Sequence, residues 1–429
     1  SQAQILIVRL LGGRSYWSYG LEVIKELATE NGIALWVLPG DDQPDGELMS
    51  HSSLPVYQVH QLWQYCQEGG RENWQQGLQW VSNLCLGTKY AVLPPQMIPN
   101  VGSYHILTDD QTPQVTPENP KVGVLFYRSH YLAGNTLVID ELCQALQAQG
   151  LNPIPFYVSS LRDPDVQEQM IQQLQRHFQT ISQEPVKLIL NTTSFSLAQL
   201  QSHGIGEDFI PLWQQLDIPV LQVILSGGTQ AQWQESLQGL NPRDLAMNVA
   251  LPEVDGRIIT RAISFKALQE WHETLQTPVM AYQSVRDRLD FVAELSKNYL
   301  NLSQTPPFER KIAIILANYP NKDGRLANGV GLDTPASCLN LLHALKEAGY
   351  IVENLPETTD ELIQRLTSGI TNDLESQEHR QIYQFLPLEA FQTYFQSLPN
   401  TVQQPIRDRW SNNLSSLLSE PATNLPPFL

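Results

Sequence analysis

Residues of three chemical kinds stand close together in the segment Arg128–Thr136, RSHYLAGNT, which directly follows the apolar run Val122–Tyr127. The planar guanidinium of Arg128 suits bidentate recognition of a carboxylate. His130 titrates near neutral pH, so it could move a proton or ligate a metal ion. Asn135 could bind a polar ligand, and either Asn135 or Thr136 could cap the helix that follows. A lone histidine more often has a structural role, but this density of polar groups after a buried strand favours a functional site.

A pair of carboxylates forms a second candidate site. Glu253 and Asp255 stand two residues apart in the polar segment Asn248–Arg257, and we place them beside Asn191, which begins an Asn-Thr-Thr segment. Two such carboxylates could share a proton or hold a divalent ion. An Asp-Gly pair also favours a simple turn, with Glu253 in solvent, and this alternative is equally open. The candidate catalytic residues are therefore Arg128, His130, Glu253 and Asp255.

A long polar loop, Asn318–Asp333, follows another apolar run. Long ordered loops are often functional. The loop lacks the phosphate-loop pattern G-x-x-x-x-G-K-[ST], and its Gly329-Val330-Gly331 lacks the third glycine of a dinucleotide fingerprint, so we predict no nucleotide site. The alternative is a turn rich in Gly and Asn that needs positive φ. The candidate substrate-binding residues of this loop are Asn318, Asn321, Lys322, Asn328 and Asp333.

Aromatic residues gather near the beginning of the sequence, in Gly12–Gly20, GGRSYWSYG. Three aromatic rings beside an arginine could stack on a planar ligand. They could equally anchor the next helix in the core. The candidate substrate-binding residues outside the long loop are Arg14, Trp17, Asn135 and Asn191.

Three parts of the sequence share the order that would position such loops: an apolar strand, a polar loop with glycine, and an amphipathic helix. The predicted strands are Ile5–Arg9, Val122–Tyr127 and Lys311–Ala317, and the helices that follow them are Tyr19–Asn31, Asn135–Gln149 and Pro335–Ala348. The pattern predicts an α/β fold with several doubly wound, mostly parallel sheet domains and additional helical segments. Ligands bind such sheets at the carboxyl ends of strands, where the candidate loops lie.

Composition shifts suggest the domain boundaries. We expect an amino-proximal α/β domain over 1–95, a linker over 96–120 that is rich in Pro, Asn, Asp and Thr, and an α/β domain over 121–302. A further α/β domain with a helical end, expected to be incomplete, occupies 303–429.

Charge and cysteine content exclude several classes of function. The chain has 26 Lys and Arg against 44 Asp and Glu, a net charge of −18, which disfavours nucleic acid or an anionic membrane as partner. The four cysteines are far apart and form no C-x-x-C pair, so we expect reduced thiols and neither a disulfide scaffold nor a thiolate zinc site. We see no transmembrane segment and no signal peptide, and we predict a cytoplasmic protein.

Two long stretches resemble a known family. VLFYRSHYLAGNTLVIDELCQALQAQGLNPIPFYVSSLR (124–162) and KIAIILANYPNKDGRLANGVGLDTPASCLNLLHALKEAGY (311–350) are similar to signature stretches of cobaltochelatase large subunits. Shorter matches are IVRLLGGRSYWSYG, LILNTTSFS, IPVLQVILSGG and LAMNVALPEVDGRIITRAISFK. The resemblance covers nearly the whole chain in order. Magnesium chelatase large subunits have a looser form of the same loops. Family members extend further in both directions, so we expect an amino-proximal portion.

The resemblance implies a function. The large subunit binds the tetrapyrrole hydrogenobyrinic acid a,c-diamide, into which Co²⁺ is inserted in cobalamin (vitamin B12) biosynthesis. Two AAA+ partner subunits hydrolyse ATP with Mg²⁺, which agrees with the missing phosphate loop here. For such an insertion we hypothesise that Arg128 pairs with a substrate carboxylate and that His130 relays a proton or passes on the metal. The loop asparagines would form hydrogen bonds with peripheral amides or carboxylates. No metal ligand set can be recognised, so His130 is only a weak candidate. Two alternatives stay open: a magnesium or nickel chelatase large subunit, and a recognition or docking module without chemistry of its own.

Overall fold

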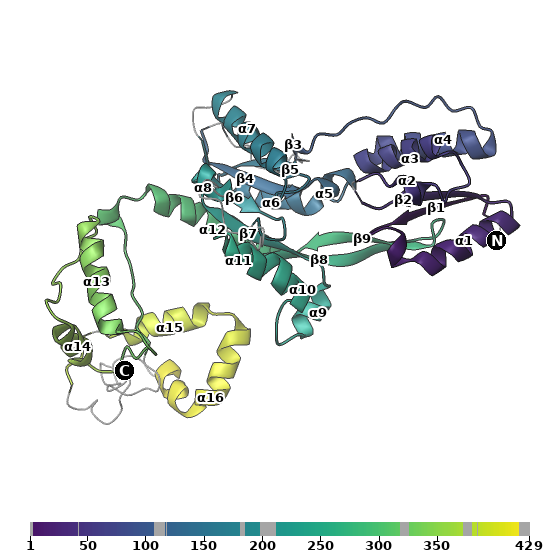
Figure 1. Ribbon diagram of the computed structural model, residues 1–429. Coiled ribbons are helices and arrows are strands. Elements are labelled where there is room, and N and C mark those ends of the chain that lie inside the picture. The colour runs from purple at the N-terminus through teal and green to yellow at the C-terminus, as the bar shows by residue number, and fades with distance from the viewer. Residues whose placement is uncertain are drawn as a thin grey trace. The chain divides into compact units, whose positions relative to one another are not determined.

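The computed structural model describes residues 3–41, 43–106, 116, 118–180, 185–197, 212–317, 326–371, 380–383 and 385–419. The chain forms two compact units, residues 1–301 and 302–429, which we describe separately (Figure 1). The candidate residues Asn318, Asn321 and Lys322 lie outside the described residues. None of the helices in the described ranges is long and apolar enough to cross a membrane.

Unit 1 begins with a small parallel sheet. Its strands β1 (Ile5–Leu10) and β2 (Ala34–Pro39) pair in parallel. Side chains of β2 alternate between two cores, because successive strand residues point to opposite faces. Trp36 and Leu38 pack with the helices on one face, and Leu35 and Val37 pack with the helix on the other. These helices are α1 (Ser18–Glu30), α2 (Gly46–Met49), α3 (Val56–Glu68) and α4 (Gly70–Leu86).

A seven-stranded sheet forms the rest of unit 1, with the strand order β3-β5-β4-β6-β7-β8-β9. The five strands from β5 to β8 in this order are parallel, and the two edge strands β3 and β9 are antiparallel to their neighbours. This result confirms the predicted α/β fold with a mostly parallel sheet. The strands are β3 (Val101–Ser103), β4 (Lys121–Tyr127), β5 (Asn152–Val158), β6 (Val186–Asn191), β7 (Val220–Ser226), β8 (Ile258–His272) and β9 (Thr277–Ser284).

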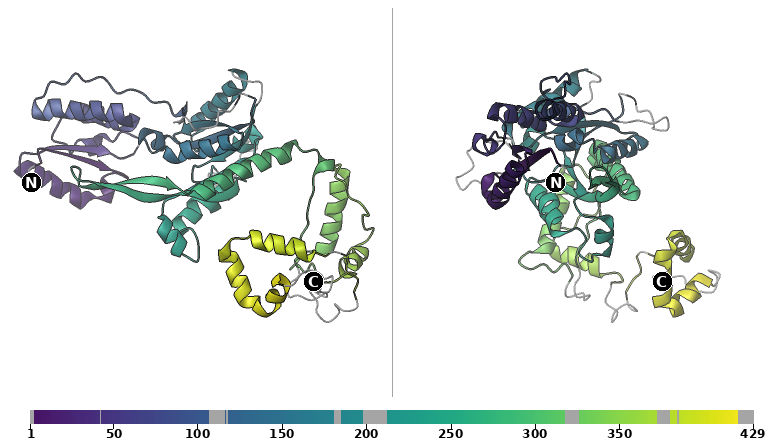
Figure 2. Two further views of the ribbon diagram at one scale, coloured as in Figure 1. Left: turned by 180° about the vertical axis from the view of Figure 1, so that it is seen from behind. Right: turned by 90° about the vertical axis from the view of Figure 1, so that its right-hand side faces the viewer.

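Helices cover both faces of this sheet (Figures 1 and 2). Helices α6 (Leu137–Ala148) and α12 (Arg286–Gln304) pack on one face, and α7 (Pro164–Thr180) and α8 (Leu212–Leu216) pack on the other. Strand β4 therefore buries Phe126 against α6 and Leu125 against α7, which is why its sequence is continuously apolar rather than alternating.

Strands β8 and β9 continue past the other strands as a long antiparallel hairpin (Figures 1 and 2). Short helical turns surround the carboxyl edge of the sheet: α5 (Arg128–Leu132), α9 (Gln230–Glu235), α10 (Pro242–Asp244), the π-helix Leu245–Ala250 and α11 (Leu251–Val254).

Unit 2 is helical in its described part. It contains α13 (Thr334–Glu347), α14 (Thr359–Thr367), α15 (Leu388–Ser397) and α16 (Asn400–Ser419). The helix predicted over Pro335–Ala348 is confirmed. The strand predicted over Lys311–Ala317 is wrong for this structure, because the segment joins no sheet and Ile312 and Ile315 are 53% and 92% exposed. An apolar run of this kind becomes a buried strand only where partner strands and covering helices are available.

Candidate functional site

The carboxyl ends of β4 and β6 meet at the point where the strand order reverses, because β5 lies on one side of β4 and β6 on the other. Ligands of open α/β sheets bind at such points. Tyr127, the last residue of β4, joins the two ends: its Oη donates to the Ser194 carbonyl and accepts from the Ser194 N–H, both at 3.1 Å. Burial raises the pKa of Tyr127, so its hydroxyl remains protonated.

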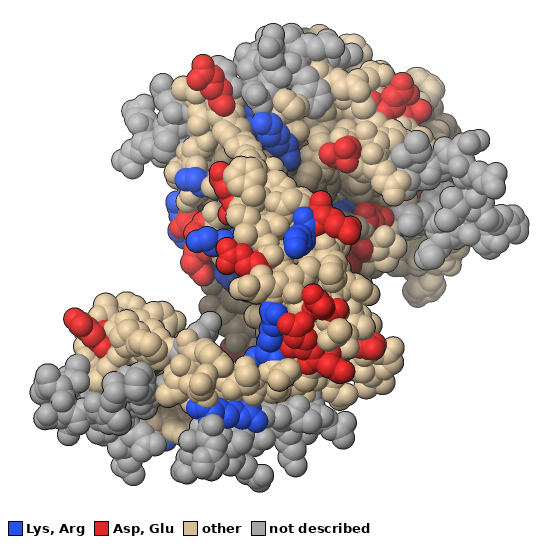
Figure 3. Space-filling model, turned by 90° about the vertical axis from the view of Figure 1, so that its left-hand side faces the viewer, with Lys and Arg blue, Asp and Glu red and all other residues tan. Residues whose placement is uncertain are grey.

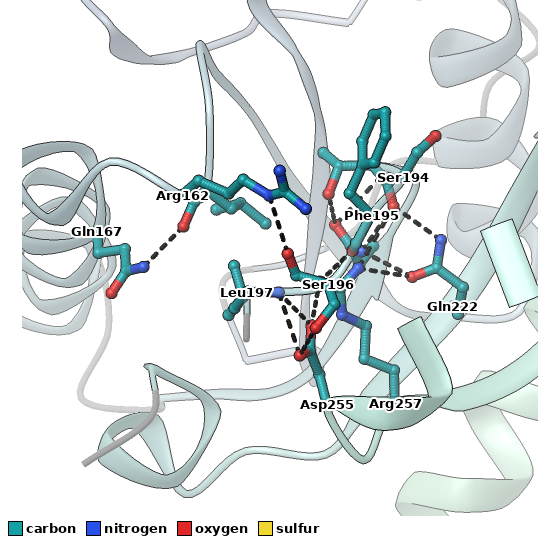
Figure 4. A network of polar contacts seen from close by, with 12 residues as sticks. Arg162, Gln167, Ser194, Phe195, Ser196, Leu197, Gln222, Asp255 and Arg257 are labelled. Atoms are coloured by element: carbon teal, nitrogen blue, oxygen red, sulfur yellow. Dashed lines mark hydrogen bonds and ion pairs between the residues drawn. The ribbon is translucent and has the colours of Figure 1, made fainter. Parts of the chain in front are cut away.

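A buried polar network lies directly beneath the loop after β6 (Figure 4). Asn191 Nδ2 donates to Gln222 Oε1 at 2.7 Å, and Gln222 Nε2 donates to the Thr193 carbonyl at 2.8 Å. Asn191 Oδ1 accepts from the Thr193 hydroxyl at 2.9 Å. Asn191 and Gln222 are fully buried. The structure thus places the candidate Asn191 in the scaffold of the loop rather than on its surface.

The ion pair between Arg257 and Asp255 also holds the loop after β6, through bonds to Phe195 and Ser196. Arg257 Nη2 lies 2.7 Å from Asp255 Oδ2, and the two side chains are 0% and 5% exposed. Arg257 Nη2 also donates to the Phe195 carbonyl at 3.0 Å, while Asp255 accepts from Ser196 Oγ at 2.6 Å. Burial lowers the pKa of Arg257, and the Asp255 carboxylate opposes this effect. The guanidinium lies over the Trp213 ring, 5.3 Å from its centroid.

Glu253, the other predicted carboxylate, has different surroundings from Asp255. The Glu253 side chain is exposed on α11, whereas Asp255 faces the buried network. The structure therefore gives Glu253 the solvated environment of the alternative interpretation and gives Asp255 a structural ion pair. Their catalytic roles stay predictions.

Asp244 is a buried carboxylate that sequence reasoning missed. It is 5% exposed and accepts from Ser226 Oγ at 2.6 Å, from the Gly227 N–H at 3.1 Å and from Asn241 Nδ2 at 2.8 Å. Asn248 connects this group to the loop after β6, because its Nδ2 donates to Asp244 and its Oδ1 accepts from Ser194. Asn-Pro before the helix signals a helix start, but nothing local signals that the aspartate is buried.

Asn248 belongs to the π-helix Leu245–Ala250. Such turns are rare and occur frequently at functional sites. Here the π-helix also provides the Met247 carbonyl, which accepts from the Phe195 N–H at 2.9 Å. Hydrogen bonds from Ser194 and Phe195 thus connect the loop after β6 to the π-helix.

His130 lies in α5, which directly follows the carboxyl end of β4. Its ring stacks on Tyr282, with centroids 5.3 Å apart and planes at 23°. Burial lowers the pKa of His130, and the charge of Lys266 lowers it further. Its Nδ1 is buried and has no hydrogen-bond partner among the described residues. Asn135 Oδ1 accepts from the Tyr282 N–H at 3.4 Å, so the structure brings the candidates His130 and Asn135 to one strand.

The side chain of Arg128 is largely buried and forms contacts within the protein. Its Nη2 donates to the Ile98 carbonyl at 2.8 Å and lies 3.3 Å from Glu68 Oε2. The side chain is only 13% exposed. Arg128 therefore ties α5 to the end of α3, and its Nη2 is already occupied by Glu68 and by the Ile98 carbonyl.

The remaining candidates belong to other elements of the chain. Arg14 and Trp17 follow β1 of the small sheet, where Arg14 pairs with Glu22 at 3.3 Å and Trp17 is 45% exposed. Asn328 and Asp333 belong to unit 2. Asp333 caps α13, because its Oδ1 accepts from the Ala336 N–H at 3.0 Å.

Within the described ranges, no three His, Cys, Asp or Glu side chains are grouped so that they could hold a metal ion. On the face shown in Figure 3, basic and acidic side chains are interspersed and form no continuous basic area.

Comparison with known proteins decides the family. A family model described as CobN/Magnesium Chelatase matches residues 63–424. The chain belongs to this family. The aerobic cobaltochelatase subunit CobN of Pseudomonas aeruginosa is 41% identical over 95% of this chain and 32% of its own length. A magnesium-chelatase subunit of Rhodobacter capsulatus is 27% identical over 63% of this chain and 23% of its own length.

A solved structure supports the same assignment. The catalytic subunit of cobaltochelatase from Mycobacterium tuberculosis is similar with a TM-score of 0.63 and 27% identity, over 95% of this chain and 32% of that chain. This chain spans about a third of the length of the cobaltochelatase subunits that it matches. The resemblance to chelatase large subunits is thereby confirmed.

Proposed function

We propose that this chain is part of the tetrapyrrole-binding large subunit of a cytoplasmic cobaltochelatase of cobalamin biosynthesis. The subunit would bind hydrogenobyrinic acid a,c-diamide and take part in the insertion of Co²⁺ as substrate metal, while two AAA+ partner subunits hydrolyse ATP with Mg²⁺. The observation that carries this proposal is the difference in similarity: 41% identity over 95% of the chain for a cobaltochelatase subunit, against 27% over 63% for a magnesium-chelatase subunit.

The chemistry of insertion gives His130 a role. A macrocycle that receives a divalent ion must lose protons from its ring nitrogens, and the ion must lose water. A neutral imidazole can accept such a proton or ligate the ion in passing. The lowered pKa of His130 keeps its ring neutral at pH 7, and its Nδ1 has no partner among the described residues. Asn135 accepts a hydrogen bond from Tyr282 of β9, the residue on which His130 stacks, and would orient a peripheral polar group of the macrocycle.

A titration tests the choice of ligand. The nine tryptophans of the chain allow binding to be followed by fluorescence quenching. We expect hydrogenobyrinic acid a,c-diamide to quench saturably and protoporphyrin IX to bind more weakly. The reverse order would favour the magnesium branch of the family, and no binding of either ring would refute a tetrapyrrole site in this chain.

A second experiment tests His130. In the assembled chelatase, His130→Ala should lower the rate of Co²⁺ insertion by roughly 10²-fold, the usual contribution of a proton-transferring group. His60→Ala is a matched control, because the His60 ring also lies 5.3 Å from an aromatic ring, that of Trp63 in α3. Equal rates for the two variants would remove His130 from the mechanism.

One observation favours a second function, a recognition or docking module without chemistry of its own. Arg128 and Asp255, two of the four catalytic candidates, are engaged in ion pairs within the protein. Such a module would bind the tetrapyrrole or the ATPase partners and leave insertion to other parts of the complex. Pull-down of the partner subunits by this chain, compared with the titration above, separates the two functions.

A further inference from the structure

Phe195 has an unusual backbone conformation in the loop after β6. Its φ is +68°, in the left-handed region that residues other than glycine rarely adopt. Its side chain is 42% exposed although it is aromatic. A strained backbone that displays an apolar ring at the carboxyl edge of a sheet is a reason to look for a ligand.

The surrounding network enforces this conformation. The Phe195 N–H donates to the Met247 carbonyl at 2.9 Å, and its carbonyl accepts from Arg257 Nη2 at 3.0 Å. The residues on either side are also fixed, because Ser194 Oγ donates to Asn248 and Ser196 Oγ donates to Asp255, both at 2.6 Å. The scaffold thus holds the ring in place before any ligand arrives, which lowers the entropic cost of binding.

Arg162, in the loop after β5, completes the feature. Its Nε donates to the Ser196 carbonyl at 3.2 Å, and its guanidinium lies 5.3 Å from the centroid of the Phe195 ring (Figure 4). The side chain is exposed, and its two terminal nitrogens have no hydrogen-bond or ion-pair partner in the part of the chain that the structure describes. An arginine in this state presents its two terminal NH2 groups at a fixed position to a carboxylate.

We propose that Phe195 and Arg162 form a binding element for a conjugated macrocycle with peripheral carboxylates, in which the ring of Phe195 packs on the macrocycle and Arg162 pairs with one carboxylate. This inference rests on the proposed function and adds the contacts that recognise the ligand. The net charge of −18 repels a polycarboxylate, so binding requires a local cation that no acid neutralises. Arg162 meets that requirement, whereas the more buried Arg128 and Arg257 are already paired.

Two ligands and three variants test the element. The ligands are hydrogenobyrinic acid a,c-diamide and the same macrocycle with its remaining carboxylates converted to amides. We expect the wild-type chain to prefer the acid, with a preference that weakens as salt is raised. Arg162→Gln should weaken binding of the acid roughly tenfold, as for loss of one charge-assisted hydrogen bond, and should abolish the preference.

The Phe195 variants separate binding from stability. Phe195→Gly should weaken binding of both ligands roughly tenfold through loss of ring contact, while its thermal midpoint stays the same or rises, because glycine tolerates the positive φ. Phe195→Tyr should keep wild-type affinity, since it keeps the ring.

The matched control is Arg261→Gln, which removes another guanidinium that lies over a phenylalanine, Phe291, at 3.4 Å from the ring centroid. Its affinities should equal those of the wild type. If the wild type binds the acid and Arg162→Gln and Phe195→Gly bind it equally well, the binding element is refuted and the proposed function stands. If the wild type binds neither ligand, both are refuted.

Discussion

Two regions at the carboxyl edge of the large sheet differ in how their polar groups are satisfied. Around Asn191 and Asp255, buried amides and charges bond to one another and to loop carbonyls, so the region fixes a loop. Around His130, an imidazole is stacked on Tyr282 with a buried Nδ1 that has no partner among the described residues. The polar residues at this edge thus form two groups. One group stabilises the loop through hydrogen bonds and ion pairs, and the other includes an imidazole nitrogen that could take part in chemistry.

The largest effect should come from breaking the ion pair of the first region. Asp255→Ala would leave Arg257 charged and buried, at a cost of about 3–5 kcal/mol in the free energy of unfolding. Denaturant unfolding measures this loss. The control Asp290→Ala removes the exposed pair with Arg286 and should cost less than about 1 kcal/mol. Equal losses would show that the Asp255 pair is not part of the scaffold.

Asn191→Ala should have the next largest effect. It leaves the buried hydroxyl of Thr193 without its acceptor, so we expect a loss of about 1–3 kcal/mol. The control is Asn31→Ala, which removes a side-chain amide that donates a hydrogen bond to the Leu27 carbonyl at the surface. It should change the free energy of unfolding by about 0.5 kcal/mol or less. A similar result for both variants would contradict the role of the buried network.

For the second region, around His130, we expect the free energy of unfolding to depend on pH. The folded pKa of His130 is lowered, so below about pH 6.5 the unfolded chain binds a proton that the folded chain does not. The stability contribution of His130 is therefore present above this pH and is lost as pH falls through the lowered pKa. His130→Gln should reduce the fall in stability between pH 7.5 and pH 5. Parallel pH profiles for the wild type and the variant would show that the imidazole is not held neutral.

The smallest effect on stability should come from Glu253→Ala. Its side chain is exposed on α11, so we expect a change within about 0.5 kcal/mol. This variant makes activity easy to interpret: lower Co²⁺ insertion with unchanged unfolding would support its predicted catalytic role. The same assay on Asp255→Ala would mix catalysis with the loss of the scaffold.

Local sequence patterns predicted many of the strands and helices but not their long-range contacts. The apolar run of β4 was predicted correctly as a strand, because both faces of β4 are covered by helices of the same unit. The segment after it was predicted as a loop, and this prediction is wrong for Arg128–Leu132, which forms helix α5. The run Lys311–Ala317 has the same character and joins no sheet. Whether such a run becomes a strand depends on partners that are distant in the sequence or supplied from elsewhere.

The candidate residues show the same limit. Asn191 and Asp255 were identified by type and position, but the bond of Asn191 to Gln222 joins residues 31 positions apart, and the bond of Asp255 to Ser196 joins residues 59 positions apart. Arg128 suggested a carboxylate site, and its contact with Glu68 joins residues 60 positions apart. Family resemblance supplied the chemistry, because no local pattern identifies a tetrapyrrole.

The unpaired segment Lys311–Ala317 has a practical consequence for solubility. Among the described residues its backbone makes a single hydrogen bond, from the Ala327 N–H to the Ala317 carbonyl, and Lys311 is its only charged side chain. Exposed apolar segments with free donors and acceptors are templates for pairing between copies of a chain. We therefore expect self-association to rise with concentration despite the strongly negative charge, and a lysine in place of Ile315, the most exposed isoleucine of this segment, to delay it.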